Sequence, residues 1–464
     1  MTTEQMRDLE QAHQVWVGQW QAQLEALHGR IAARFKRLEV RERVRHFLAA
    51  LLDDVERKNS WQMAEQMGEA HPAGVQRLLR TAKWEVDGVR DDLRGYVSDE
   101  LGDPEGVGVV DETGFLKKGR KSVGVKRQYS GTAGRVENSQ VGVFLAYSSA
   151  NGRAFLDRRL HLPEEWAKDA VRRAEAGVPT DVRFATKPEL AEQMLAAAFA
   201  AGVPMAWVTG DEVYGNASGL RAWLEAEDHP YVLAVATTHE VWLAGTDAEP
   251  VAVAVGILAE ALPERAWMRL SAGEGSKGPR LYDWACVRLP FLPTAGMAKW
   301  VLVRRSIAKP DERAYYRVFG PVETTLPQMV RVAGQRWVIE EVIERAKGEV
   351  GLDQYEVRTW EGWHRHITLA LLAHALLEVT RAQTNTALAT GERGTSSYLD
   401  PLYSGRTPSG LAPSDGTTPP VDLPPGLVSV AARPSGESSR LPSAAAVAPL
   451  RSPQSGPRCL NVSL

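Results

Sequence analysis

The pattern that most limits the fold begins near residue 105, where three β-rich runs follow one another: VGVVDET, SVGVKRQYSG and QVGVFLAYSS. Turn-forming residues separate these runs, and their β-branched and aromatic side chains are typical of strands. A stretch with helical composition, PELAEQMLAAAFAAG, and another apolar run, MAWVTG, come next. This order predicts an α/β sheet whose early strands are joined by hairpins.

Acidic residues stand at the ends of two of these strands. The first run leads into Asp111, and the run MAWVTG continues directly into Asp211. A carboxylate is a poor core residue, and α/β sheets bind their ligands at strand ends, so both aspartates are candidate site residues. The alternative is that each aspartate caps the turn or helix that follows it, where Asp is favoured.

A third acidic segment, QRWVIEEVIERAKGEVG at residues 335–351, reads as a helix. At about 100° per residue, Arg336, Glu340 and Lys347 fall along one stripe. Glu341 points away from that stripe. The stripe borders a face of apolar residues, namely Ile339, Val342, Ile343 and Ala346. Glu340 is therefore the better placed glutamate, and the alternative is a row of i,i+4 ion pairs on an exposed helix.

Asp111, Asp211 and Glu340 are together the ligands that a pair of divalent cations requires. Mg²⁺ is a hard cation that prefers carboxylate and water oxygens. Two such ions roughly 4 Å apart activate an attacking oxygen and neutralise the leaving oxygen in an in-line phosphoryl displacement. Three carboxylates brought together without cations would repel one another. The sequence thus predicts two ions of Mg²⁺ or Mn²⁺ held by these three residues.

Residues 1–104 show helical periodicity, and we expect a helical, DNA-binding domain there. Within it, SWQMAEQMGEAHPAGVQRLLRTAKW predicts a helix from Ser60, a stop at Gly68 and a second helix after a turn. The second helix is expected to carry cations at three-residue spacing: Arg77, Arg80 and Lys83. This arrangement resembles a helix-turn-helix. The alternative is a pair of helices that merely pack together.

A basic ribbon follows Asp111. The whole chain has a net charge of −3, so contacts with nucleic acid must come from local basic patches. No acidic residue lies between Glu112 and Glu137, and this interval contains Lys117, Lys118, Arg120, Lys121, Lys126, Arg127 and Arg135. Such a ribbon is suited to tracking a phosphate backbone. The alternative is an exposed hairpin whose cations serve solubility alone.

The second half of the chain divides by composition. Residues 230–325 contain strand-like runs with little helical signal, and we interpret them as a β-rich insertion between residues 105–229 and residues 326–383. The last of these segments ends in a helix, GWHRHITLALLAHALLEVTRA, that we expect to be largely buried. Residues 384–464 are rich in Pro, Ser and Gly without an apolar period, which predicts a disordered tail.

Three strings in this order, VVDETGFLKKG, VTGDEVYG and QRWVIEEVIERAK, resemble the acidic motifs of DDE transposases, in particular insertion-sequence family 701 of the insertion-sequence 4 group. The resemblance covers about residues 35 to 382. It implies a ribonuclease-H-like catalytic domain in which Asp111, Asp211 and Glu340 form the catalytic triad.

The third motif of that group has the form Tyr-x-x-Arg-x-x-x-Glu-x-x-x-x-x-x-Lys. Arg336, Glu340 and Lys347 stand at this spacing, which implies that Arg336 and Lys347 bind DNA phosphates. Ala333 occupies the position of the tyrosine. This departure leaves open how a strand end is held in any hairpin intermediate.

The resemblance implies a DNA transposase that cuts and joins transposon ends by metal-dependent phosphoryl transfer. Its partners would be double-stranded DNA with terminal inverted repeats and, in the end complex, a second copy of the chain. Two alternatives stay open. One is a structure-selective metal-dependent nuclease on the same fold, and the other is a catalytically inactive DNA-binding protein derived from a transposase.

The cellular compartment is predicted from the cysteine content and from the lack of membrane or export signals in the sequence. Cys286 and Cys459 have no metal-ligand spacing, and from them we expect a reducing environment without disulfides. No long apolar run or N-terminal signal predicts a membrane segment or export. We therefore expect a soluble, cytoplasmic protein at the nucleoid of a prokaryote.

Insertions in this group of transposases carry an aromatic side chain that stacks on a displaced base, and every base offers a π-face for such contact. The corresponding candidates in residues 230–325 are Trp242, Trp267, Trp284 and Trp300, and the sequence does not discriminate among them. Core packing is the alternative for each one.

The tail departs from the family, in which a basic stretch of the type Trp-x-x-Trp-Arg-Arg-x-His-Gln is expected after the buried helix. Residues 399–411 and 426–440 can both be back-translated and re-read one base later as family-like basic strings. Two matches in one frame favour a frameshift between about Arg381 and Leu399. Ordinary disorder is the alternative explanation of the composition.

Overall fold

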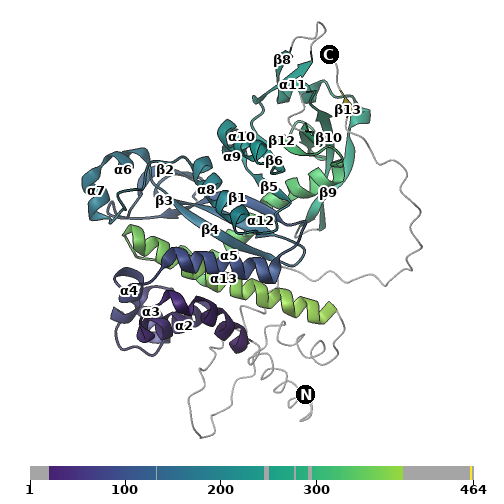
Figure 1. The fold of residues 1–464 in the computed structure, drawn as a ribbon. Helices are drawn as coiled ribbons and strands as arrows, with labels where there is room; N and C mark the ends of the chain where they lie inside the picture. Colours follow the sequence, from purple (N-terminus) through teal and green to yellow (C-terminus); the bar gives the residue numbers. More distant parts are fainter. Residues whose placement is uncertain are drawn as a thin grey trace.

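The computed structural model describes residues 20–131, 133–244, 250–275, 278–290, 295–389 and 460–461. Helices cover both faces of a large mixed sheet (Figure 1). The α/β class expected from the order of strands and helices is confirmed at this level.

Helices make up the described chain before residue 105. The 3-10 helix η1 (Ala32–Arg34) precedes α2 (Leu38–Leu52), α3 (Ser60–Gln66), α4 (Ala73–Arg80) and α5 (Val86–Leu101). The expected helix start at Ser60 is confirmed, and Gly68 adopts a left-handed φ of 72° where the stop was expected. α4 ends at Arg80, so Lys83 lies beyond the helix that was expected to carry it. DNA reading by α3 and α4 stays a prediction.

Residues 107–161 form four antiparallel strands: β1 (Val107–Leu116), β2 (Lys126–Ser130), β3 (Arg135–Ser148) and β4 (Arg153–His161). β3 pairs with each of the other three. The first three strands match the expected runs. β4 was missed because its sequence, RAFLDRRLH, is highly charged. Asp157 and Arg158 are nevertheless fully buried in it, since Asp157 accepts a hydrogen bond of 2.8 Å from Arg94 of α5.

Two parallel strands follow in the same sheet. β5 (Trp207–Gly210) lies between β1 and β6 (Tyr231–Val235) and is parallel to both. β5 confirms the strand predicted from the run MAWVTG. Its last residue, Gly210, pairs with Val110 of β1, the residue before Asp111.

Most strands of residues 230–325 extend this sheet outward from β6. They are β9 (Met268–Gly275), β10 (Gly278–Arg288), β11 (Met297–Arg305) and β12 (Arg313–Pro321), and β12 pairs antiparallel with β6. With β13 (Leu460–Asn461) at one edge, the eleven-stranded sheet has the order β13-β10-β11-β12-β6-β5-β1-β3-β2, with β4 beside β3 and β9 beside β10. Outside it, β7 (Glu240–Ala244) and β8 (Pro250–Ala254) pair with each other and precede α11 (Val255–Glu260) and η2 (Glu264–Ala266).

Helices on opposite faces of the sheet contact alternate residues of β1. On one face, Gly108 lies close to Leu195 of α8 (Lys187–Ala200), which is followed by α9 (Glu212–Gly215) and α10 (Ser218–Ala226). On the other face, Thr113 contacts Lys347 of α12 (Leu326–Val350). Short helices α6 (Glu164–Lys168) and α7 (Ala170–Glu175) follow β4. Side chains alternate along a strand, so Asp111 shares the α12 face with Thr113.

The long helix α13 (Trp360–Ala389) is buried between β4 and the helices α2, α4 and α5. Trp363, Ile367 and Leu371 have no exposed surface, which confirms the expected buried helix. Figure 1 shows α13 and α5 running side by side beneath the sheet.

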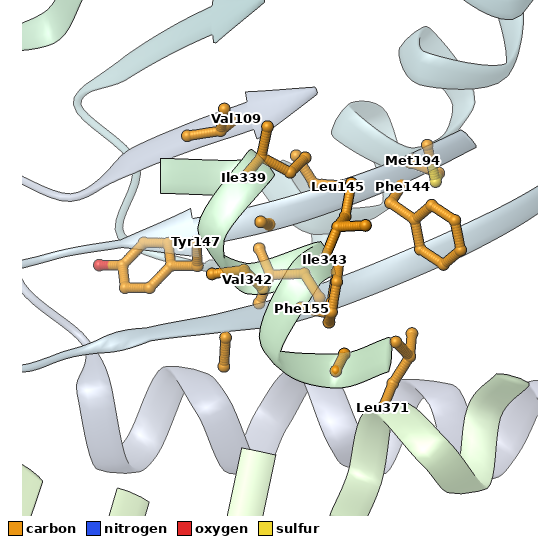
Figure 2. Packing of buried hydrophobic residues seen from close by; sticks show 14 of the residues in the cluster. Val109, Phe144, Leu145, Tyr147, Phe155, Met194, Ile339, Val342, Ile343 and Leu371 are labelled. Atoms are coloured by element: carbon orange, nitrogen blue, oxygen red, sulfur yellow. The ribbon is translucent and has the colours of Figure 1, made fainter. Parts of the chain in front are cut away.

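Apolar side chains seat α12 on the sheet. Figure 2 shows Ile339, Val342 and Ile343 of α12 in one cluster with Val109 of β1 and Phe155 of β4. All five are buried, so the buried face expected from the helical wheel is confirmed. The helix begins after Thr325, whose side chain accepts from the Gln328 amide, and ends at Gly351, which is left-handed with a φ of 62°.

The described part of the tail differs from a wholly disordered segment. α13 continues past residue 384, and β13 (Leu460–Asn461) pairs in parallel with β10, which otherwise offers a free edge there. Cys286 in β10 is disulfide-bonded, so the expectation of free thiols is wrong in this structure. The proposed frameshift between about Arg381 and Leu399 falls mostly, and both re-read segments fall entirely, outside the described residues. Among the described helices, none combines the length and hydrophobicity that a membrane span requires.

Candidate active site

Asp111 and Asp211 meet because their strands are parallel neighbours. β1 and β5 pair with Val110 opposite Gly210, so the next residue of each chain segment is an aspartate at the same edge. Asp111 continues β1, and its Oδ1 accepts a hydrogen bond of 2.7 Å from the Glu112 amide. Asp211 leaves the strand and caps α9, accepting from the Val213 amide at 2.8 Å. The capping alternative therefore holds for Asp211, and it positions the carboxylate without removing it from the site.

The two carboxylates resist ionisation. Burial, followed by the negative charges of Asp211 and Glu112, raises the pKa of Asp111 to about 7. Burial and the charge of Glu112 also raise the pKa of Asp211. Arg336 opposes both shifts, which places its guanidinium within electrostatic range of the pair. A site that disfavours its own negative charge is one that a cation would stabilise.

Glu112 is held on the opposite face of β1 from Asp111. Its two oxygens accept hydrogen bonds from Lys187 of α8 at 2.5 Å and from the Tyr214 hydroxyl of α9 at 2.7 Å. Tyr214 has no exposed surface. These contacts tie β1, α8 and α9 together directly beside both aspartates. The sequence reasoning missed Lys187 and Tyr214, although Tyr214 lies within the string GDEVYG.

The stripe of α12 runs along the Asp111 face of β1. Arg336, at the aspartates, pairs with Glu340 at 2.9 Å. Further along, Lys347 donates a hydrogen bond of 2.9 Å to Thr113, two residues after Asp111. Glu340 therefore lies on the helix between Lys347, which contacts β1, and Arg336, whose charge acts on Asp111 of β1. By contrast, Glu341 pairs with Arg153 at 2.6 Å, in agreement with its expected outward direction.

Asp111, Asp211 and Glu340 are not gathered as tightly as the ligands of an occupied metal site would be. In the described part of the chain, the three-residue group whose ligand atoms all lie within 4.8 Å of one another is Glu349, His374 and Glu378. There Arg381 already pairs with both glutamates at 2.6 Å, and Arg345 pairs with Glu378 at 3.5 Å. Two guanidiniums balance two carboxylates in that cluster, which gives it no need of a cation.

The donor set of Asp111, Asp211 and Glu340 fits the expected hard cations. All three offer carboxylate oxygens, and burial, followed by the charges of neighbouring carboxylates, raises the pKa of both aspartates. The Glu340 side chain is 53% exposed and engaged with Arg336. It would have to exchange Arg336 for the cation, and an exposed rotamer-rich side chain can do so at small cost.

Arg336 belongs to a cluster that the sequence did not reveal. Three guanidiniums surround the ring of Trp337, with their Cζ atoms 4.8 to 5.0 Å from its centroid: Arg280, Arg304 and Arg336. Arg280 lies on β10 and Arg304 on β11, so strands of the outer sheet contribute positive charge on the Trp337 ring that Arg336 also contacts. No spacing rule links residues 280, 304 and 336, because only the sheet order brings them together.

The basic ribbon is divided by the structure. Lys117 stacks on the Tyr355 ring at 3.4 Å and donates to the Tyr355 carbonyl, and burial lowers its pKa to about 8. The other predicted DNA-binding cations lie nearer the surface: Lys118, Arg120, Lys121, Lys126 and Arg127. Lys121 and Lys126 pair with the acids Glu175 and Glu165, at 3.2 and 2.7 Å respectively.

Two of the four candidate tryptophans are core residues. Trp284 and Trp300 are 0% and 2% exposed, whereas Trp242 in β7 is 56% exposed. Trp267 is covered on one face by Arg305 at 4.2 Å. Ala333, in the position of the family tyrosine, has no exposed surface.

Comparisons with known proteins agree with the motifs. Residues 30–255 match the family described as DDE superfamily endonuclease, a range that contains Asp111 and Asp211 and ends before Glu340. The match covers slightly less than half of the chain. The class of protein that this chain resembles is thus the DDE superfamily endonucleases.

Within that class, the chain is similar to the probable transposase for insertion sequence element IS701 of Microchaete diplosiphon. The two are 27% identical over 202 residues, which is 43% of this chain and 50% of the relative. The chain therefore spans about half the length of that relative. The expected resemblance to a DDE transposase of the IS701 kind is confirmed.

One solved structure with a similar trace is a piggyBac transposase synaptic complex with hairpin DNA. Its TM-score is 0.33 at 11% sequence identity, and the match covers 78% of this chain and 73% of that chain.

Proposed function

We propose that the protein is a DNA transposase that cuts and joins transposon ends by metal-dependent phosphoryl transfer on a ribonuclease-H-like core. The observation that carries the proposal is the meeting of Asp111 and Asp211 where β5 ends beside the middle of its parallel neighbour β1, under a helix stripe that presents Arg336, Glu340 and Lys347. The similarity to DDE superfamily endonucleases and to an IS701 transposase supports it.

In this proposal Asp111, Asp211 and Glu340 hold two ions of Mg²⁺ or Mn²⁺. When bound, such ions activate an attacking oxygen and stabilise the leaving oxygen of a phosphodiester. Asp111 and Asp211 are oriented for this by backbone amides and by the Glu112 network. Arg336 is displaced from Glu340 and turns to a DNA phosphate, for which its planar fork is suited. Lys347 supplies a second positive charge near Thr113.

The proposed partner is double-stranded DNA that carries the terminal inverted repeats of the element. The cations that lie at or near the surface after β1, namely Lys118, Arg120, Lys121, Lys126 and Arg127, would follow its phosphates, and Lys117 would contribute charge from its position on Tyr355. Joining requires two ends in one complex, so we further propose a homodimer on DNA. The site of action would be the nucleoid in the cytoplasm of a prokaryote.

The direct test is cleavage and joining of a labelled duplex that bears the element's end. We expect nicking that depends on Mg²⁺ or Mn²⁺, followed by transfer of the liberated 3′-hydroxyl to a second duplex. Cleavage without joining would instead identify a nuclease. Binding without cleavage, at any concentration of either ion, would identify an inactive DNA-binding protein derived from a transposase.

A further inference from the structure

A basic groove lies beyond the end of β1, away from the aspartates. Its cavity measures about 930 Å³, and its walls come from parts of the chain that are distant in sequence. They include Arg80 at the end of α4, Arg120 after β1, Arg127 of β2, Arg172 of α7 and Arg358 before α13. Figure 1 shows α4, β2, α6 and α7 on the same side of the molecule.

The groove has a strong excess of positive charge. Seven basic and two acidic side chains line it, which leaves an excess of five positive charges in a chain whose net charge is −3. The two acids are Glu165 and Glu175, and each is paired with one lysine of the lining. The arginines gathered there have no carboxylate of their own in the lining. Like charges held together repel one another, so the arrangement is stabilised by a bound polyanion.

The chemistry of the lining fits a sugar–phosphate backbone better than a base or a free nucleotide. The one aromatic residue of the lining, Trp166, is 2% exposed and is covered by Arg172 at 3.9 Å, so it offers no open face for stacking. The Asn138 amide is committed to the carbonyls of Lys117 and Gly119. What the groove presents is charge from several elements, which is the signature of contacts that ignore base sequence.

We propose that this groove holds the phosphate backbone of the same DNA duplex at a distance from the scissile bond. The proposal rests on the proposed function, because it needs a DNA substrate at Asp111. It joins α4, the basic ribbon and α7 into one contact surface. Neither α7 nor Arg358 carries a sequence signal for DNA binding, and both are placed there only by the fold.

The length of β1 sets the distance between the groove and the scissile phosphodiester. Asp111 lies five residues before the end of β1 at Leu116, which is about 17 Å of extended strand. At about 3.4 Å per base pair, the groove would first meet DNA about five base pairs from the scissile phosphate. A duplex that extends fewer than about five base pairs from the scissile phosphate on the groove side is too short to contact the groove.

The test compares Arg127→Gln/Arg358→Gln with Arg265→Gln/Lys309→Gln, which removes two exposed charges outside the groove. Binding is measured across a salt series on a long duplex and on one with three base pairs on each side of the cut. On the long duplex, we expect the groove variant to lower the slope of log K against log salt by about 0.9 for each lost contact. The control variant should match the wild type on both duplexes, and on the short duplex all three proteins should agree. The proposal would be overturned if the groove variant kept the wild-type salt slope on the long duplex. It would also be overturned if the groove variant lost as much slope on the short duplex as on the long one.

A second variant is expected to act in the opposite direction. Glu165→Gln/Glu175→Gln frees Lys126 and Lys121 from their carboxylates, so binding of the long duplex should tighten severalfold and its salt dependence should steepen. Unchanged or weaker binding contradicts the groove. The proposed function and the groove can fail separately. If the wild-type protein binds DNA through the groove but does not cleave it, the transposase assignment is rejected and the groove is retained. If the protein cleaves normally and its binding does not depend on the groove residues, the groove is rejected and the transposase assignment is retained.

Discussion

Asp111 lies in an environment that disfavours its own ionised form. It is half-buried on the face of β1 that α12 covers, and desolvation together with the charges of Asp211 and Glu112 raises its pKa to about 7. A free carboxylate in water would ionise near pH 4. The fold therefore holds this group in an environment where its negative charge is costly unless positive charge is brought in.

At the residue scale, the first prediction concerns catalysis. Asp111→Asn, Asp211→Asn and Glu340→Gln should each reduce cleavage of an end-bearing duplex by at least about 10³-fold, because each removes one negative charge from the site proposed to hold two metal ions. DNA binding should stay within about threefold of wild type. A gel cleavage assay with a parallel binding assay measures both.

Glu341→Gln is the matched control for Glu340→Gln. Its carboxylate pairs with Arg153 on the other side of the helix, so cleavage should change little. Inactive Glu341→Gln together with active Glu340→Gln would show that the wrong glutamate of the pair has been assigned to the site.

The second prediction links the pKa of Asp111 to stability. Its folded pKa of about 7 lies above the ordinary aspartate pKa of 3.8, so the folded state binds the proton more tightly than the unfolded state does. The stability that this proton contributes is fully present below about pH 4 and is lost as the pH rises through 7. In the presence of a chelator, Asp111→Asn should thus be more stable than wild type at pH 8, by about 1 to 4 kcal/mol, and less so at pH 5.

Urea unfolding of both proteins at the two pH values, with EDTA and then with Mg²⁺, tests this. Mg²⁺ should stabilise wild type and leave Asp111→Asn largely unaffected. If the difference between the two proteins did not depend on pH, Asp111 would titrate normally and the electrostatic account of the site would be wrong.

At the scale of elements, α12 carries the part of the site that sequence periodicity predicted best. The wheel placed Ile339, Val342 and Ile343 on the buried face and Glu341 away from it, and the structure agrees. This worked because a long amphipathic helix on a sheet obeys one period throughout. The same reasoning treated Lys117 and Lys118 alike, since a hairpin has no comparable period. Only the structure shows that Lys117 turns inward onto Tyr355.

The third prediction is about the two cations of the α12 stripe. Arg336→Ala and Lys347→Ala should each weaken binding of an end-bearing duplex and lower the salt slope by about 0.9, because each lost phosphate contact leaves one counterion unreleased. Burial lowers the pKa of Lys347, so its charge is sensitive to its surroundings, and phosphate binding should restore it. Affinities measured from low to moderate salt give the slopes.

Lys347→Met separates the charge from the packing of the side-chain stem. It should show the same loss of slope as Lys347→Ala with a smaller loss of stability. If the Arg336 and Lys347 variants had the wild-type salt slope, neither residue would bind a DNA phosphate. Arg336 would then serve only as the ion-pair partner of Glu340, and Lys347 only as the hydrogen-bond donor to Thr113.

At the scale of the whole molecule, the sheet joins regions that composition separates. Residues 230–325 read as an insertion, yet their strands β9 to β12 continue outward from β6 in the sheet that holds β1. Sequence patterns cannot supply this result, because β6 and β12 are paired across nearly eighty intervening residues and strand order is not written in local periodicity. The Arg280 and Arg304 contacts with Trp337 follow from that pairing and were invisible for the same reason.

The last prediction follows from this continuity. Because β12 pairs with β6 along five residue positions, the outer strands and the strands that carry Asp111 and Asp211 should unfold as one cooperative unit. Native-state hydrogen exchange should then give β6, β11 and β12 amides the same opening free energy as β1 and β3 amides, within about 1 kcal/mol, and the same dependence on denaturant. β7 and β8 form a separate small sheet and should exchange earlier, which provides the internal control. If β11 and β12 opened at clearly lower free energy than β1, residues 230–325 would be an independent unit, and Arg280 and Arg304 could not be held rigidly on Trp337 of α12.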